Sequence, residues 1–196
     1  LYKEGFKITA ISDAKGGIRN EQGFNIFEVA GCVKRSGTVL GCYCVGNICE
    51  APGNYKIISN KELLESDVDI LIPAALENQI TEENAGKIKA KIILEMANGP
   101  VSPEADEILK KKGILMIPDI LANAGGIAVS YFEWMQNLQG DRWEEEAVLL
   151  KLHKLMAGSL SDLMKIVEKY NVDMRTAAYI LAVERIAKAI NLRGGF

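Results

Sequence analysis

Residues 90–117 read AKIILEMANGPVSPEADEILKKKGILMI, and their pattern decides the fold. The continuous apolar runs at 90–96 and 114–117 have the length and composition of strands that are buried on both faces. Between them, Ser102 is placed to cap a helix that begins with a proline, and Gly113 is placed to end it. A strand, a helix and a second strand in this order predict a parallel βαβ unit with a right-handed crossover.

The same alternation extends along the chain in both directions. The expected elements are strands at 6–12 and 68–73, a loop over 14–25, helices at 26–35 and 81–88, irregular chain at 36–55, and a capped helix start at Ser59. Beyond Gly126 the pattern is helical to the end, with breaks near 140–141 and 171–173. We therefore expect an α/β fold, Rossmann-like and doubly wound, with a mostly parallel sheet in residues 1–140 and C-terminal helices in 141–196.

Composition limits the classes of protein that fit. The chain has 196 residues, 48% of them hydrophobic, which is enough for one domain with a sizeable core, or one domain plus an appendage. The formal net charge of −3 argues against a general nucleic-acid binder, which would carry a basic patch or stripe. No apolar run reaches the roughly 18 residues that suggest a membrane span. Because no signal peptide is recognisable either, we expect no membrane partner and a cytoplasmic location.

The cysteines are Cys32, Cys42, Cys44 and Cys49. Zinc sites usually combine ligands at paired CxxC spacings. Here the last three cysteines have the spacing C-x-C-x4-C, and the single histidine, His153, is far along the chain. We therefore expect no metal site, and instead reduced thiols in an apolar strand and loop, as in a reducing compartment.

Ligands of open parallel sheets bind beyond the carboxyl ends of the strands. Asp13 directly follows the first expected strand, where an acid can accept hydrogen bonds from adenosine ribose hydroxyls and repel a 2′-phosphate; a turn-forming aspartate explains it equally well. Ala74 and Ala75 follow the 68–73 strand, where small residues let a cofactor approach the backbone or simply form a tight turn. Asn98 can donate to a ribose or a carboxamide, or can belong to an Asn-Gly-Pro turn.

Residues 119–134, DILANAGGIAVSYFEW, are the richest candidate site. We expect an apolar strand end to pass through Asn123 into a turn at Gly125 and Gly126, where a ligand can approach the backbone closely. Asn123 adds a donor and an acceptor, and Ser130 is expected to face the same cleft about one turn into the following helix. The alternative is a helix N-terminus whose glycines only permit close packing.

One expected motif is missing. Dinucleotide-binding folds usually carry G-x-G-x-x-G about 20 residues before the ribose-binding acid. Counting back from Asp13 runs off the start of the chain, and the Lys-Gly-Gly at 15–17 follows the acid instead. Residues 1–5 are expected to be the end of a first helix with a glycine stop, so the sheet is expected to lack its first strand.

With these motifs, the chain closely resembles the cofactor-binding half of the hexameric glutamate dehydrogenases. The resemblance covers almost the whole chain, in family order, through the stretches ISDAKGGIRNEQGFNI (11–26), DVDILIPAALENQIT (67–81), EMANGPVSPEAD (95–106), IPDILANAGGIAVSYFEWMQN (117–137) and VDMRTAAYILAVERIAKAINLRG (172–194).

The resemblance implies an oxidative deamination that uses NAD, with NADP as the other possibility. L-Glutamate would pass a hydride from its α-carbon to the nicotinamide, and the resulting imine would be hydrolysed to 2-oxoglutarate and ammonia. By the same resemblance, Asp13 would bind the adenosine ribose, and Ala74 and Ala75 would line the cofactor.

The resemblance also assigns the remaining candidates. Asn98 would lie near the nicotinamide ribose, and Asn123 near the nicotinamide and the substrate. Gly125 and Gly126 would allow close approach in the cleft. Ser130 would bind the side-chain carboxylate that distinguishes glutamate from the apolar amino acids used by related dehydrogenases.

The family's catalytic lysine and aspartate belong to a substrate domain that has no match in these residues. We therefore expect no catalytic residue in this chain and no dehydrogenase activity from it alone. Without a Gly-rich loop to hold the pyrophosphate, NAD is expected to bind weakly. The alternative is a stand-alone or degraded module that binds a nucleotide, or nothing, and acts in assembly through its helical surface.

The helical tail ends in an apolar stripe within residues 176–190. We expect this stripe to face the core, as in an ordinary amphipathic helix. In the family the last helix packs on the substrate domain, and the complete enzyme is a homo-oligomer. In this chain the same surface is expected to be uncovered or covered by another copy.

Overall fold

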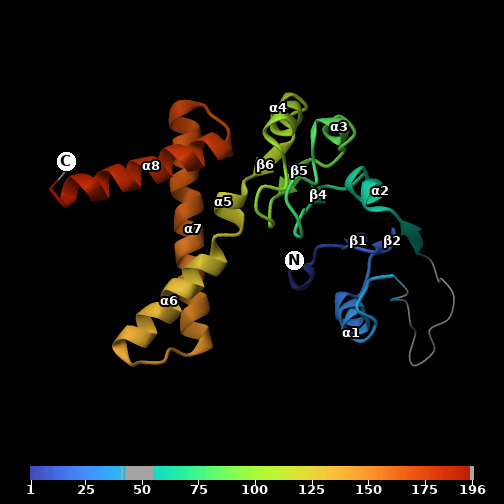
Figure 1. Ribbon diagram of the computed structural model, residues 1–196, viewed down its shortest axis with the longest axis horizontal. Coiled ribbons are helices and arrows are strands. Elements are labelled where there is room, and N and C mark those ends of the chain that lie inside the picture. Colours follow the sequence, from blue (N-terminus) through green and yellow to red (C-terminus); the bar gives the residue numbers. More distant parts are fainter. Residues whose placement is uncertain (41, 43–54, 195–196) are drawn as a thin grey trace. The chain divides into compact units, whose positions relative to one another are not determined.

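The computed structural model describes residues 1–40, 42 and 55–194. They divide between two compact units, whose bounds are Leu1–Asp67 with Lys87–Lys89, and Val68–Gly86 with Ala90–Phe196. Both units combine helices with a three-stranded sheet, which confirms the α/β class (Figure 1). The expected boundary at residue 140 stays a prediction. In the part of the chain that is described, no helix has the length and apolar character of a membrane span.

The first unit is built around an antiparallel sheet of strand order β1-β2-β3. Its elements in chain order are η1 (Tyr2–Glu4), β1 (Ala10–Asp13), β2 (Gly16–Arg19), α1 (Ile26–Ser36), β3 (Lys56–Ile58) and α2 (Asn60–Leu64). Ile18, Phe24, Val29 and Val39 form a buried core cluster in this unit. The helix end expected in residues 1–5 is the short 3-10 helix η1, which Gly5 ends with a φ of 86°.

The prediction of a loop over 14–25 is wrong in part, because strand β2 lies within this segment and pairs with both β1 and β3. The glycine that suggested a loop lies instead where these strands pack closely. A Cβ at Gly17 would lie 3.1 Å from the Cγ1 of Ile58 and 3.2 Å from the carbonyl oxygen of Ile11. A glycine inside a strand therefore marks a close backbone approach here, not a loop.

The two helices of the first unit begin where the sequence predicts. The side chain of Asn25 accepts a hydrogen bond from the backbone N–H of Phe27 and caps α1. Ser59 and Glu62 form a reciprocal capping box at the start of α2. The segment expected to be irregular, 36–55, lies largely outside the described residues.

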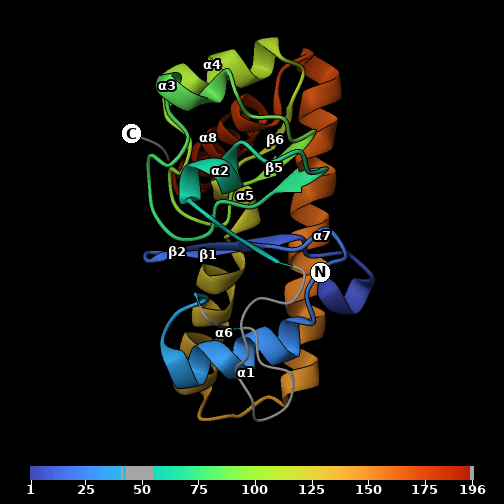
Figure 2. The same cartoon turned by 90° about the vertical axis from the view of Figure 1, so that its right-hand side faces the viewer.

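The second unit contains the parallel sheet predicted from residues 90–117. Its first elements are β4 (Ile70–Leu71), α3 (Glu82–Ala85), β5 (Ile92–Leu94), α4 (Pro103–Lys111) and β6 (Leu115–Ile117). The strand order is β4-β5-β6, with Ile70 opposite Ile92 and Ile93 opposite Met116. The strands are predicted correctly but are shorter than expected. Helices α3 and α4 lie side by side, as both views show (Figure 2).

Four helices follow the parallel sheet: α5 (Asp119–Ala122), α6 (Gly125–Gln139), α7 (Glu145–Tyr170) and α8 (Met174–Leu192). The expected breaks are confirmed at Gly140 and Asn171, which have φ angles of 66° and 50°. Helix α8 crosses α7 (Figure 1), and the crossing buries a core of Leu163, Ile166, Met174, Ala177 and Ala178.

Two expectations about this helical region are wrong. Residues 119–122 form helix α5 and not a strand end. The apolar stripe of α8 faces the core only in its first half: Ala177 is fully buried, whereas Val183 and Ile186 are 63% and 61% exposed.

Candidate nicotinamide-side site at the end of the parallel sheet

Asp13 lies in the first unit, where backbone groups surround its carboxylate. One oxygen accepts a hydrogen bond from the N–H of Lys15 at 2.8 Å, and the other accepts from the N–H of Val39 at 2.7 Å. Hydrogen bonds from Val39 and then Lys15 hold the pKa of Asp13 below its ordinary value. The turn-forming role is therefore present, and the ribose-binding role stays a prediction.

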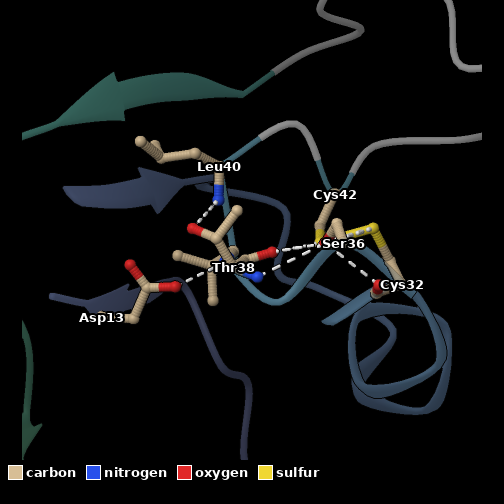
Figure 3. The surroundings of a disulfide bond; sticks show 7 residues. Asp13, Cys32, Ser36, Thr38, Leu40 and Cys42 are labelled. Carbon is tan, nitrogen blue, oxygen red and sulfur yellow. Dashed lines mark hydrogen bonds between the residues drawn. A yellow bond between two sulfur atoms is a disulfide. The ribbon is translucent and has the colours of Figure 1, made fainter. Parts of the chain in front are cut away.

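The loop that carries Val39 is also the place of a disulfide. Cys32 in α1 is bonded to Cys42, and the hydroxyl of Ser36 between them donates to the carbonyl oxygen of Cys32 at 3.1 Å (Figure 3). The expectation of reduced thiols is thus wrong for these two cysteines, because α1 ends at a left-handed Gly37 that turns the chain back toward Cys32. Cys44 and Cys49 lie outside the described residues. Among the residues that are described, no group of three or more His, Cys, Asp or Glu side chains could hold a metal.

The second unit brings two predicted residues together beyond the carboxyl end of its parallel sheet. Asn98 follows β5, and Asn123 follows α5. The Nδ2 of Asn123 donates to the Oδ1 of Asn98 at 2.7 Å. Among the described residues, the Nδ2 of Asn98 and the Oδ1 of Asn123 have no protein partner, so the pair offers one N–H donor and one carbonyl acceptor to a ligand.

The other predicted residues of this unit are placed but not joined to that pair. Ala74 and Ala75 are exposed in the chain that follows β4. Gly125 and Gly126 form the first two positions of α6, and a Cβ on Gly126 would meet nothing within 4 Å. Close packing within this chain therefore does not require Gly126. Ser130 is exposed on α6.

A buried ionic cluster lies beside the asparagine pair, and no sequence pattern predicted a role for its members. Arg175, in the first turn of α8, contacts Glu95 at 2.8 Å, Asp106 at 2.9 Å and Asp119 at 3.6 Å. The side chain of Glu95 is 0% exposed and that of Arg175 is 21% exposed. Burial opposes the charge of Arg175, but the carboxylates of Glu95 and Asp106 outweigh it and raise the pKa of Arg175.

A signal for this cluster does exist in the sequence. Glu95 lies within the apolar run at 90–96, next to its last residue, and a carboxylate buried there needs a partner. The sequence does not say which of the Lys and Arg residues supplies it, because Glu95 and Arg175 are 80 positions apart.

An apolar groove of about 480 Å³ also lies in the second unit, between α5, α6, α7 and α8. Its walls include Ile120, Ile127, Leu155 and Leu181, with Arg185 among them. None of the predicted site residues lines it.

Comparison with known proteins supplies a family. The model of the Glutamate/Leucine/Phenylalanine/Valine dehydrogenases matches residues 1–194. A glutamate dehydrogenase from Thermotoga maritima is 54% identical over 97% of this chain and 43% of its own length. An NADP-specific glutamate dehydrogenase from Synechocystis is 48% identical, and an NAD-specific one from Staphylococcus aureus is 46% identical, each over 99% of this chain and 45% and 44% of its own length.

Solved structures agree with the sequence relatives. The hetero-hexameric glutamate dehydrogenase from Thermus thermophilus, in its Leu-bound form, matches with a TM-score of 0.85 and 27% identity, over 100% of this chain and 44% of its own. The chain thus spans less than half the length of the relatives it matches. Because the family model and a relative at 54% identity both cover nearly all of it, this chain belongs to the Glutamate/Leucine/Phenylalanine/Valine dehydrogenase family.

Proposed function

We propose that this chain is the nicotinamide-cofactor-binding part of a glutamate dehydrogenase. The complete enzyme would convert L-glutamate, NAD(P)⁺ and water into 2-oxoglutarate, ammonia and NAD(P)H. The observation that carries the proposal is the Asn98–Asn123 pair beyond the carboxyl end of the parallel sheet, which is where α/β sheets bind ligands. We extend the proposal to the fold, in which β4, β5 and β6 belong to a Rossmann-like, doubly wound sheet.

The chemistry of the asparagine pair supports a nicotinamide nucleotide. Its remaining N–H donor and carbonyl acceptor match the hydrogen-bonding groups of a carboxamide or a ribose. In the proposed complex Asn98 lies near the nicotinamide ribose, and Asn123 lies between the nicotinamide and the substrate. Gly126 leaves open space beside Gly125 at the start of α6, and in the proposed complex these two glycines let the ligand approach the backbone.

The same proposal assigns the remaining side chains. Ala74 and Ala75 line the cofactor, and Ser130 donates to the side-chain carboxylate of glutamate. Asp13, whose lowered pKa keeps it charged, accepts hydrogen bonds from the adenosine ribose. Such an acid disfavours a 2′-phosphate, so NAD is the proposed cofactor and NADP the alternative. The relatives include enzymes of both specificities.

A titration of the ¹⁵N-labelled chain with NAD⁺, followed by nuclear magnetic resonance, tests the cofactor site. The side-chain amide signals of Asn98 and Asn123 are expected to shift, and Asn123→Ala is expected to weaken binding by about tenfold through a lost hydrogen bond. Asn137→Ala, an exposed asparagine further along α6, is the matched control and is expected to bind normally. Unchanged Asn98 and Asn123 signals at millimolar NAD⁺ would contradict the site.

We further propose that the 196 residues alone do not turn over glutamate, because they match less than half of each relative. Glutamate-dependent NADH formation by the purified chain would overturn this. L-Glutamate and 2-oxoglutarate remain the proposed substrates of the complete enzyme. We propose that the complete enzyme is a cytoplasmic homo-oligomer, specifically a hexamer.

A second candidate function is that of an assembly module without catalysis, which draws support from the exposed Val183 and Ile186 of α8. A chain that self-associates and binds no nucleotide would favour it.

A further inference from the structure

We propose that Asp119 is a positioning residue, whose carboxylate sets the geometry of the Asn98–Asn123 pair. The inference rests on the proposed function, because it concerns how the same site is held. Asp119 joins the two segments that carry the pair, because it contacts the turn after β5 and is the first residue of α5.

The first arm is held by the side chain of Asp119. Its Oδ2 accepts a hydrogen bond from the backbone N–H of Gly99 at 2.8 Å, which fixes the residue directly after Asn98. Gly99 has a φ of 51°, in the left-handed region. The hydrogen bond to Asp119 therefore stabilises a turn conformation that few residues other than glycine adopt. A carboxylate that accepts from a backbone N–H makes a charge-assisted and therefore stronger hydrogen bond.

The second arm is held by the backbone of the same residue. The carbonyl oxygen of Asp119 accepts from the N–H of Asn123 at 3.0 Å. One residue thus contacts Gly99 through its side chain and Asn123 through its main chain. The distance between the amides of Asn98 and Asn123 depends on where Asp119 sits.

Asp119 is itself held from the opposite side. The buried Oε2 of Glu95 accepts from the N–H of Asp119 at 2.9 Å, and the Nη1 of Arg175 lies 3.6 Å from the Oδ1 of Asp119. The other oxygen of Glu95, Oε1, accepts a hydrogen bond from the Nη2 of Arg175 at 2.8 Å. Glu95 directly follows β5, and Arg175 lies in the first turn of α8, so Asp119 is linked to the sheet and to the last helix.

The test compares two ligands that share the adenosine half but differ at the nicotinamide. NAD⁺ and ADP-ribose are titrated against the full ¹⁵N-labelled chain, its Asp119→Ala and Asp119→Asn variants, and Asp106→Asn as the control. Asp106 contacts the same arginine but not Gly99. Asp119→Ala is expected to weaken the binding of NAD⁺ by about five- to tenfold and to leave the affinity for ADP-ribose unchanged. Asp119→Asn keeps an acceptor for Gly99 and is expected to restore part of the loss.

The readouts separate a positioning role from a merely structural one. A general loss of stability would weaken the binding of both ligands equally. Asp106→Asn would then lower the two affinities as Asp119→Ala does. The side-chain amide signal of Asn123 and the backbone amide of Gly99 supply a ligand-free readout: both signals are expected to move in Asp119→Ala, with faster hydrogen exchange at Gly99.

Unchanged Asn123 and Gly99 signals in Asp119→Ala, or equal weakening of NAD⁺ and ADP-ribose, would overturn the positioning role. If the wild-type chain binds neither ligand, the proposed function fails. The ligand-free signals still decide whether Asp119 holds the pair.

Discussion

At the scale of single residues, buried charge is the feature with the largest expected effect on stability. Arg175 is the cation that contacts the fully buried Glu95. Arg175→Met is expected to lower the free energy of unfolding by about 3–5 kcal/mol, because it leaves Glu95 buried without its partner. Urea unfolding measures the change. Arg185→Met is the control: its ion pair with Asp162 is about half exposed, and its loss is expected to cost about 1 kcal/mol or less. Equal losses of unfolding free energy in Arg175→Met and Arg185→Met would contradict the special role of the buried ion pair.

A second residue-scale prediction concerns acid stability. Asp173 caps α8, accepting from the N–H of Thr176 at 2.9 Å, and pairs with Lys110 at 3.0 Å. Burial opposes its charge, but these bonds outweigh burial and lower its pKa from 3.8 to about 2. Because the folded-state pKa is the lower one, the stabilisation is complete above about pH 4 and is lost as the pH falls toward 2.

This contribution is expected to be about 2 kcal/mol at neutral pH. Asp173→Asn keeps the capping oxygen but removes the charge, so unfolding free energies at pH 7 and pH 3 should differ less than in the wild type. The exposed Asp67 supplies the control substitution, Asp67→Asn, which is expected to leave the acid dependence unchanged. An unaltered acid dependence in Asp173→Asn would refute the assignment.

At the scale of elements, local patterns predicted the helices and strands that obey local rules. Helix α4 begins at its Ser102 cap and gives way to a left-handed Gly113, as the sequence indicates. Helix α5 could not be predicted in this way, because the N–H that opens it is satisfied by Glu95, 24 residues earlier in the chain. Strand β2 was missed because Gly17 serves close packing with β1 and β3 and not chain reversal.

The close packing at Gly17 predicts that glycine-to-alanine substitutions at positions 17 and 31 change the free energy of unfolding in opposite directions. Gly17→Ala places a Cβ 3.1 Å from Ile58 and is expected to destabilise the antiparallel sheet by about 1–3 kcal/mol. Gly31→Ala, inside α1, meets only the flexible end of Arg35 at 3.7 Å and is expected to stabilise by about 0.5–1 kcal/mol. Chemical denaturation of both variants measures the change in the free energy of unfolding. Stabilisation by Gly17→Ala would disprove the close-packing explanation.

At the scale of the whole molecule, the order of motifs along the chain was enough to predict the α/β class and the family. Both residues of the asparagine pair were also predicted from the sequence, because each comes soon after an expected strand of the parallel sheet, although helix α5 stands between β6 and Asn123. The Arg175 cluster that fixes it was not, since it joins residues that only the tertiary fold brings together. Likewise, apolar spacing predicts that α8 is amphipathic but cannot say what its apolar stripe contacts.

The exposed stripe of α8 leads to a prediction about the chain in solution. Val183, Ile186 and Ile190 are 63%, 61% and 41% exposed, and they lie at helical spacing on one face. With a net charge of only −3, electrostatic repulsion between copies is weak. The chain is therefore expected to self-associate with rising concentration, as sedimentation velocity would detect.

A charge placed within the stripe should reduce that association. Ile186→Glu would bury a carboxylate in any contact made by the stripe, so the variant is expected to remain smaller at the same concentration. Leu76→Glu is matched to it, because Leu76 is 60% exposed but lies in the chain after β4 and not on the stripe. If Leu76→Glu disperses the chain as effectively as Ile186→Glu, net charge and not the α8 surface controls the association. If neither changes it, the contact between copies lies elsewhere.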